Sequence, residues 1–392
     1  MLNRRDVLKS LGLTAAACGV PGFAFADTDK RLVLVILRGA VDGLALAAPY
    51  GDGNYRRVRG ELAIADPGSS DGLLKLDGLF GLHPSLGAIH QNYLHGQALV
   101  IHAAASPYRE RSHFDGQDVL ENGASAVGAL RDGWLNRALT GDNLAIALAQ
   151  NTPLVLRGDA AVTSWAPSPL PDADGGTLQR LQRLYANDEF FRSRLEQALK
   201  SQAIANSAGD MDDTGPRGNE ARQFGELMSA AARFLTAADG PNIAVVEFGG
   251  WDTHANQGAS TGALANRFKA LDDGISHLQL GLGNAWDDTV VAVVTEFGRT
   301  VHVNGTRGTD HGTANAAVLV GGAVNGGKVI ADWPGLADSN LYAGRDLMPT
   351  MDIRSVFKGL LEEHLEVPRG TLEQRVFPDS ESATPLRNLI SV

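Results

Sequence analysis

The chain has 392 residues, 44% of them hydrophobic and 20% charged, and a formal net charge of −11. This composition is typical of a globular protein with a substantial core, and the length fits one large α/β domain with insertions or two domains. The negative charge argues against a non-specific nucleic-acid binder, and no internal run approaches the roughly 20 apolar residues that span a bilayer.

The N-terminal segment predicts an export signal rather than part of the fold. Within residues 1–26, a pair of arginines at positions 4 and 5 precedes a modest apolar stretch and the small residues Ala24 and Ala26. This layout resembles a twin-arginine signal that is cleaved after Ala26. The alternatives are a frayed basic helix and a lipoprotein-type signal at Cys18. We expect export in the folded state, to the periplasm or outside the cell.

Cleavage of this signal would leave a mature protein without thiols, because Cys18 is the only cysteine. Disulfides, zinc–thiolate sites and a cysteine nucleophile are then excluded. Twin-arginine export often carries proteins that already hold a cofactor, so the signal favours a metal. Any such metal must be bound by His, Asp or Glu side chains.

Apolar runs alternate with helical patterns along the rest of the chain. The predicted strands are 32–37, 98–104, 154–156, 242–248, 290–295 and 317–322, and the predicted helices between them include 84–95, 115–122 and 262–280. Continuous apolar, β-branched runs are typical of strands buried on both faces of a parallel sheet. The alternation therefore predicts an α/β fold with a doubly wound, mostly parallel sheet flanked by helices.

Residues 159–240 depart from this alternation, because they are mostly helical in pattern. We interpret them as a helical insertion over one edge or mouth of the sheet. On this interpretation residues 27–392 form a single domain, and its last segment, 365–392, returns to the core.

Polar residues gather where the predicted strands end, which is where ligands bind in open parallel sheets. Four of these clusters follow strand runs and a fifth precedes the run at 317–322. They contain Arg38 and Asp42, Ser112 and His113, Asp252 and His254, Glu296 and Arg299, and Asp310 and His311.

Each cluster also has a purely structural interpretation. Asp42 can be a turn residue, and Asp252 and His254 can be loop-capping residues. Glu296 at the sheet mouth needs a partner, which Arg299 can supply as a structural ion pair. The glycines around Asp310 and His311 allow close backbone approach but equally suit a tight turn.

Taken together, the clusters predict a divalent metal bound by oxygen and nitrogen ligands, such as Zn, Mn, Ca or Mg. Such an ion polarises a phosphoryl, sulfuryl or acyl oxygen, and nearby arginines neutralise a substrate anion. Ser112 opens a predicted helix, so its hydroxyl is a candidate nucleophile beside the positive helix end. The structural alternative is that Ser112 is an N-cap in a capping-box arrangement with Asp115.

A succession of motifs resembles a bacterial family of twin-arginine-exported proteins of unknown function, assigned to the alkaline phosphatase and sulfatase superfamily. The resemblance covers about residues 30–390, and its most specific part is TEFGRT followed by GTDHGTAN. It implies an alkaline phosphatase-like fold with one or two metals at the strand ends. It also implies a nucleophile at a helix start, which places Ser112, with His113 beside it, in the nucleophile region.

The resemblance further implies metal ligands at particular positions of this chain. The ligand positions are Asp42, Asp252, His254, Glu296 and His311, with Asp310 as a further contributor. Two departures limit the analogy: Glu296 and Phe297 stand where phosphatases have Asp-His, which makes a full two-zinc site doubtful. Ala105 stands at the modified position of a sulfatase motif, so no formylglycine can form there.

These observations predict a periplasmic metal-dependent hydrolase acting on a small-molecule or polysaccharide phosphate or sulfate ester. The alternative is a non-catalytic envelope protein of the same fold that binds a protein or polysaccharide partner. A phosphomutase-type transferase is a third interpretation, but the periplasm is poor in sugar phosphates and nucleotides, which argues against it.

Overall fold

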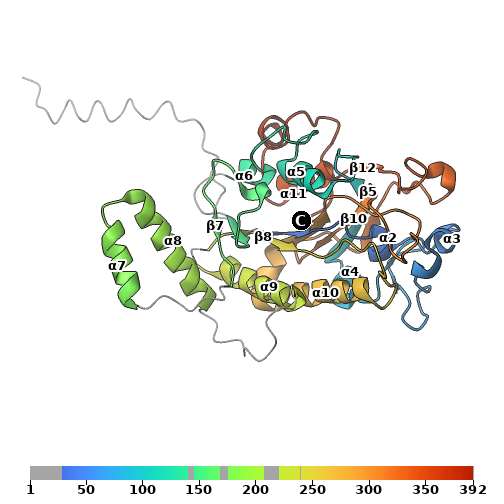
Figure 1. Cartoon of the computed structure of the whole chain (residues 1–392), viewed down its shortest axis with the longest axis horizontal. Helices are drawn as coiled ribbons and strands as arrows, with labels where there is room; N and C mark the ends of the chain where they lie inside the picture. Colours follow the sequence, from blue (N-terminus) through green and yellow to red (C-terminus); the bar gives the residue numbers. More distant parts are fainter. Residues whose placement is uncertain (1–28, 140–144, 168–174, 207–219, 239, 392) are drawn as a thin grey trace, which may run out of the picture.

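The computed structural model describes residues 29–139, 145–167, 175–206, 220–238 and 240–391, and the predicted export signal lies outside them. A nine-stranded sheet crosses the molecule in the order β11-β5-β10-β9-β1-β8-β6-β7, and β12 pairs with β5 (Figure 1). Its strands are β1 Arg31–Leu37, β5 Ala98–Ala105, β6 Ala145–Leu148, β7 Thr163–Ser164, β8 Ile243–Phe248, β9 Thr289–Thr295, β10 Asn315–Val320, β11 Lys328–Ile330 and β12 Met351–Asp352. A small second sheet joins β2 Ala47–Ala48, β4 Gly81–Leu82 and β3 Leu74–Lys75.

Helices cover both faces of the large sheet. On one side lie α4 Gly87–Leu94, α9 Glu220–Thr236 and α10 Ala263–Leu282, and on the other lie α5 His113–Asn122, α6 Trp134–Ala138 and α11 Ile353–Glu363 (Figure 1). Alternate residues of β1 enter the two cores, Val33 and Val35 on the α9–α10 side and Leu34 and Ile36 on the α11 side. Burial on both faces explains why the strands are continuous apolar runs. The fold is thus mixed α/β, with a mostly parallel sheet flanked by helices.

The remaining helices are short or lie outside these layers. They are α2 Gly43–Leu46, α3 Tyr55–Arg59, α7 Gly175–Tyr185, α8 Glu189–Asn206 and α12 Arg369–Thr371, with 3-10 helices at Gly60–Leu62, Leu154–Leu156, Gly283–Asp288 and Asp338–Asn340 and a π-helical turn at Leu372–Val376. Within the described part of the chain, no helix is long and apolar enough to cross a membrane.

Five of the six predicted strands are confirmed, as β1, β5, β8, β9 and β10. The prediction of a strand at 154–156 is wrong, because these residues form a 3-10 helix that begins after Pro153. The Val155 amide donates to the Glu121 carboxylate over 3.0 Å instead of to a neighbouring strand. β8 pairs with β1 on one side and with β6 on the other, and the sequence patterns did not indicate β6.

The predicted insertion at 159–240 contains two different structures. Helices α7 and α8 extend away from the body of the molecule as a pair, whereas α9 lies under the sheet against α10 (Figure 1). Helix α9 buries Phe224, Met228 and Phe234, so it belongs to the main core. The segments that connect these helices at 168–174 and 207–219 lie outside the described residues.

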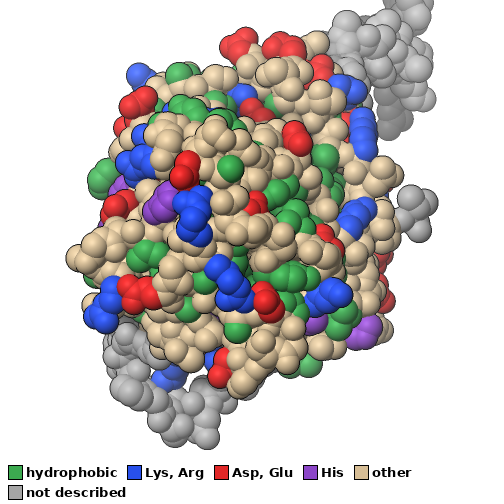
Figure 2. All heavy atoms as spheres, turned by 90° about the vertical axis from the view of Figure 1, so that its right-hand side faces the viewer, with side chains coloured by type: hydrophobic (Ala, Val, Ile, Leu, Met, Phe, Trp, Pro, Cys, Tyr) green, Lys and Arg blue, Asp and Glu red, His purple; other side chains and the backbone are tan. Residues whose placement is uncertain are grey.

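The surface on the side of α2 and α3 has acidic and basic side chains interspersed with hydrophobic ones (Figure 2). Nucleic-acid binding surfaces concentrate Lys and Arg on one face. The face in Figure 2 has no such concentration.

Because three histidines are buried, the free energy of unfolding is expected to depend on pH in the acid range. Burial lowers the pKa of His83, His102 and His364 to about 4 in each case, and each Nε2 lies 2.8–2.9 Å from a backbone carbonyl oxygen. The unfolded chain takes up protons at these rings near pH 6.5, whereas the folded protein does so only near pH 4. The free energy of unfolding therefore falls as the pH drops through this window.

Each ring is expected to contribute about 2 kcal/mol to the fall between pH 7 and pH 5. Urea unfolding of wild type and His364→Gln at the two pH values measures the difference, and the variant should lose less stability than wild type on acidification. The exposed residue His95 provides the control, since His95→Gln should behave as wild type. Equal losses in His364→Gln and wild type would contradict the assignment.

Candidate metal centre

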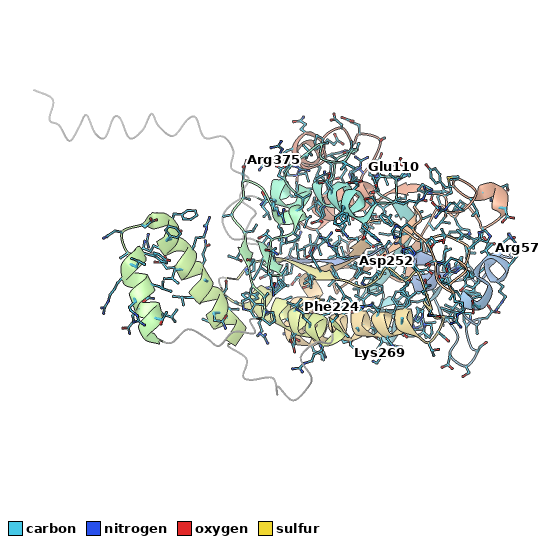
Figure 3. The ribbon with its side chains drawn as sticks, in the orientation of Figure 1. Arg57, Glu110, Phe224, Asp252, Lys269 and Arg375 are labelled. Carbon is cyan, nitrogen blue, oxygen red and sulfur yellow. The ribbon has the colours of Figure 1, made fainter. Side chains whose placement is uncertain are left out.

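Five neighbouring strands bring the polar clusters to one edge of the sheet. β5, β9, β1 and β8 end at this edge, and β10 begins there because it runs antiparallel to β5 and β9, with Asn315 paired to Ala104. The residues that follow β5, β9, β1 and β8 and those that precede β10 therefore lie at the same edge of the sheet. Figure 3 shows Asp252, which follows β8, between the two helical layers, and its side chain is 39% exposed.

Three histidines and one aspartate converge at this edge. The Nε2 atom of His311 lies 3.0 Å from the Nε2 atom of His113 and 3.0 Å from that of His254. Asp252 Oδ1 lies 3.0 Å from His254 Nε2 and 3.2 Å from His311 Nε2, and Asp252 Oδ2 lies 3.4 Å from His113 Nε2. Ligand atoms of His113, Asp252 and His311 all lie within 4.8 Å of one another, and His254 contacts the last two of these residues.

The opposite nitrogen of each ring faces an acceptor that fixes its orientation. His113 Nδ1 lies 2.8 Å from Glu296 Oε1, and His254 Nδ1 lies 3.1 Å from Asp310 Oδ1. His311 Nδ1 lies 2.9 Å from the carbonyl oxygen of Arg111. Because an ionised carboxylate and a carbonyl oxygen only accept, Nδ1 donates in each neutral ring and Nε2 carries a lone pair.

The three carboxylates of the cluster are ionised at neutral pH. Burial opposes ionisation of Asp252, but a hydrogen bond and the charge of Arg299 outweigh it and lower its pKa. Burial likewise opposes ionisation of Glu296, and hydrogen bonds from His113 and Gly39 outweigh it, so its pKa is also lowered. The hydrogen bond from Asn304 is the main reason that the pKa of Asp310 is low.

The histidine pKa values move in opposite directions. The hydrogen bond to Glu296 raises the pKa of His113, whereas burial, followed by the nearby charge of His113, lowers the pKa of His311. Protonation is thus favoured on His113 and disfavoured on the neighbouring His311.

This arrangement fits a metal ion between His113, Asp252 and His311, with His254 beside two of these residues. The Nε2 atom of His311 and the carboxylate of Asp252 lie 3.0–3.4 Å from each other and from the Nε2 atoms of His113 and His254. Lone pairs at this separation repel one another unless a proton or a metal cation lies between them. Zinc–nitrogen bonds of about 2.0–2.1 Å at tetrahedral angles separate two ligands by about 3.3 Å. At such centres a histidine usually binds the metal through one ring nitrogen, while the N–H group of the other donates to a carboxylate or a carbonyl.

Glu296 and Asp310, both predicted as ligands, instead lie behind the histidines as hydrogen-bond partners. Glu296 is 1% exposed and also accepts from the Gly39 amide over 2.8 Å. His113, predicted as a catalytic residue, lies among the converging nitrogen atoms. The predicted Asp252, His254 and His311 lie there with it.

Arg299 is buried and contacts the Asp252 carboxylate, rather than Glu296 as the structural interpretation of the sequence suggested. Its Nε donates to Thr309 Oγ1 over 3.1 Å, and a further nitrogen donates to the Thr309 carbonyl oxygen. The side chain is 0% exposed, so it holds Asp252 in place from behind instead of facing a substrate.

Asp42 lies apart from the converging ligand atoms. Its carboxylate caps α2 by accepting from the Leu44 amide, forms an ion pair with Arg59 and accepts from Gln257 Nε2 over 2.6 Å. Asp42 and Arg59 are both buried. A carboxylate with these three partners is a structural group in this arrangement.

Ser112 is the N-cap residue of α5, one position before His113, but its side chain makes no capping hydrogen bond. Its amide donates to the Tyr108 hydroxyl over 3.0 Å. The hydroxyl of Ser112 is therefore not engaged by the helix it precedes.

The chain matches, over residues 29–375, the family described as "Protein of unknown function (DUF1501)". The chain belongs to this family. The membership suggested by the motifs is confirmed in this respect, while the twin-arginine route stays a prediction. No significant relative was found among curated proteins.

Several solved structures are distantly similar to this member of the DUF1501 family. The PsFucS1 sulfatase from Pseudoalteromonas sp. aligns with a TM-score of 0.41 and 12% identity, covering 99% of this chain and 76% of that one. The phosphonate monoester hydrolase of Agrobacterium radiobacter aligns with a TM-score of 0.34 and 14% identity, covering 86% and 74%. The C-terminal periplasmic domain of EcEptC from Escherichia coli, in complex with Zn, aligns with a TM-score of 0.31 and 11% identity, covering 75% and 73%.

Substitution of Gly308, in the loop that carries Asp310 and His311, is expected to destabilise the fold. A Cβ atom at Gly308 would lie 2.4 Å from the carbonyl carbon and oxygen of His254. We expect Gly308→Ala to displace His254 and to cost about 1–3 kcal/mol of stability. Thermal unfolding checks the loss, and Gly305→Ala in the same loop is the control, since nothing lies within 4 Å of that site. Equal stability of the two variants would show that the His254 backbone yields freely.

Proposed function

We propose that this chain is an exported, metal-dependent hydrolase of phosphate or sulfate esters, with one divalent ion held by His113, His254, His311 and Asp252. The observation that carries the proposal is the convergence of three imidazole Nε2 atoms and one carboxylate, with each ring oriented by an acceptor on its Nδ1 atom.

The donor set favours zinc among the metals considered. Calcium and magnesium take oxygen ligands and usually six or more of them, whereas imidazole suits zinc and neighbouring transition metals. Three nitrogens and one carboxylate match zinc best in this arrangement. A zinc ion held by His113, Asp252 and His311 would keep its fourth position open. There it would supply Lewis acidity, which polarises an ester and stabilises the negative charge that develops during its cleavage.

The chain's own residues prepare the centre for this chemistry. Glu296 and Asp310 hold His113 and His254 in the tautomer whose Nε2 atom can bind a metal. Arg299 fixes the rotamer of Asp252. In this proposal Ser112, beside His113 at the start of α5, supplies the nucleophilic hydroxyl.

The N-terminal sequence supports export, because Arg4 and Arg5 precede an apolar stretch and small residues. We accordingly place the substrate outside the cytoplasm, as a small-molecule or polysaccharide ester that carries a phosphate or sulfate group.

Metal analysis of the mature protein, purified without a metal-chelating tag, tests the proposal together with an ester panel. We expect about one equivalent of zinc, and hydrolysis of an aryl phosphate or aryl sulfate that His254→Ala abolishes. Protein that neither contains nor takes up a divalent metal would overturn the proposal. Protein that binds one zinc but hydrolyses no ester across a broad panel would instead support a non-catalytic binding protein.

Ser112→Ala separates the nucleophile from the metal ligands. The variant should keep its zinc, because Ser112 contributes no atom to the converging set, and should lose at least about 100-fold in turnover. Zinc content and kcat on the same aryl ester are the two measurements, and Ser69→Ala, at an exposed position, is the control. Full activity in Ser112→Ala would show that Ser112 is not the nucleophile and would indicate water instead.

A further inference from the structure

We propose that Arg345 and Arg111 form an oxyanion subsite beside His311, which binds the charged oxygens of a tetrahedral phosphate or sulfate group. This inference rests on the proposed function, since it assigns the substrate's anionic part to residues next to the metal ligands.

Two guanidinium groups share one buried carboxylate at this position. Arg111 donates to Asp346 Oδ2 from Nε over 2.8 Å and from Nη2 over 2.7 Å. Arg345 Nε donates to Asp346 Oδ1 over 3.0 Å. The Asp346 side chain is 0% exposed, whereas those of Arg111 and Arg345 are 24% and 44% exposed.

One carboxylate cannot neutralise two guanidinium groups, so the cluster keeps a surplus positive charge. Among the residues that the structure describes, no other carboxylate pairs with Arg111 or Arg345. The Nη1 atom of each side chain also makes no hydrogen bond within that part of the chain. Two partly exposed guanidinium groups with surplus charge and free donors, held on a buried carboxylate, have the composition of an anion site.

The subsite is joined directly to a metal ligand. Arg345 Nη2 donates to the His311 carbonyl oxygen over 2.7 Å, and His311 Nδ1 donates to the Arg111 carbonyl oxygen over 2.9 Å. Both arginines therefore contact His311, Arg345 through its guanidinium and Arg111 through its backbone carbonyl. A tight turn fixes Arg345, because the backbones of Tyr342 and Asp346 bond to each other in both directions over 2.9 and 3.0 Å.

This geometry selects a class of ligand. A tetrahedral oxyanion could direct one oxygen toward a metal ion held between the Nε2 atoms and another toward a guanidinium, whose donors match phosphate and sulfate oxygens. A neutral carboxylic ester offers no such charge. We therefore expect the site to prefer esters that carry at least one ionised oxygen on phosphorus or sulfur.

Titration of zinc-loaded mature protein with inorganic phosphate, followed by calorimetry, tests the subsite without requiring turnover. We expect Arg345→Gln to weaken phosphate binding at least 10-fold while its zinc affinity stays within about threefold of wild type. Arg345→Lys keeps the charge and should recover part of the loss. Arg375→Gln removes an exposed arginine far from Asp252 (Figure 3) and should bind phosphate as wild type does.

The outcomes separate this inference from the proposed function. Zinc-loaded Arg345→Gln that binds phosphate as tightly as wild type overturns the subsite and leaves the metal centre intact. Wild-type protein that takes up no zinc overturns the proposed function, and the metal-free protein then reports phosphate binding by the arginines alone. Equal losses in Arg345→Gln and Arg375→Gln would show a general charge effect and also overturn the subsite.

Discussion

A His311→Ala variant is expected to lose about 100- to 1000-fold in zinc affinity, because structural zinc binding of about 10–16 kcal/mol is shared among four donors. His311 is the sharpest choice among the four, since its Nε2 atom lies within 3.2 Å of a ligand atom of each of the others. Removing it leaves Asp252 as the neighbour that His113 and His254 share.

Competition with a chromophoric chelator measures this affinity, and thermal unfolding with and without a chelator supplies an independent readout. Zinc at about 1000 times its dissociation constant stabilises the folded state by about 4 kcal/mol, so a chelator should lower the melting temperature of wild type much more than that of His311→Ala. His277→Ala removes an exposed histidine and should match wild type in both assays. Zinc affinity that is unchanged in His311→Ala would place the metal elsewhere.

The edge of the sheet that carries the site could be predicted from the sequence, because each polar cluster adjoins a recognisable strand. The strand at 317–322 was also identified, but its direction was not visible in its residues. Only the antiparallel pairing of β10 explains why Asp310 and His311, which precede a strand, meet clusters that follow strands.

The sequence could not predict which residues place a ligand atom at the centre and which orient a neighbouring ring, because these roles depend on side-chain direction rather than on residue type. Asp310 and His311 are adjacent in sequence, yet Asp310 orients His254 while His311 presents its own Nε2 atom to the centre. Glu296 follows β9 as a ligand would, but its carboxylate accepts from His113. His113 itself looked like a neighbour of the nucleophile.

The supporting residues left even less trace in the sequence. The acceptor for His311 Nδ1 is the backbone carbonyl of Arg111, and any residue type carries one. Asp346 gains its role only because a turn far along the chain brings it between Arg111 and Arg345. No local motif marks such a contact.

Asp42 has the sequence pattern of a metal ligand, but in the structure its carboxylate pairs with an arginine. It follows the first strand and precedes a glycine, the position that the motif resemblance implies for a metal ligand, but it pairs with Arg59 of α3. The pair connects to the metal centre indirectly, since Gln257 bonds to Asp42 and to Thr309, which in turn accepts from Arg299.

Breaking this pair is expected to produce the largest stability loss of any single substitution considered. Asp42 and Arg59 have side chains that are 1% and 0% exposed, and removing one partner of a buried ion pair costs about 3–5 kcal/mol because the other charge is left uncompensated. Arg59→Met should therefore destabilise the fold by that amount while adding no new charge. Urea unfolding monitored by circular dichroism measures the loss.

Two further variants distinguish the buried charge from simple loss of packing. The double variant Asp42→Asn with Arg59→Met removes both charges and should recover a large part of the stability that Arg59→Met loses. Arg57→Met, two residues earlier on the same helix, breaks an exposed pair with Asp338 and should cost no more than about 1 kcal/mol. If Asp42 instead bound a metal, Asp42→Asn alone would lower zinc content. The contacts of Asp42 predict that it lowers stability and leaves one equivalent of zinc in place.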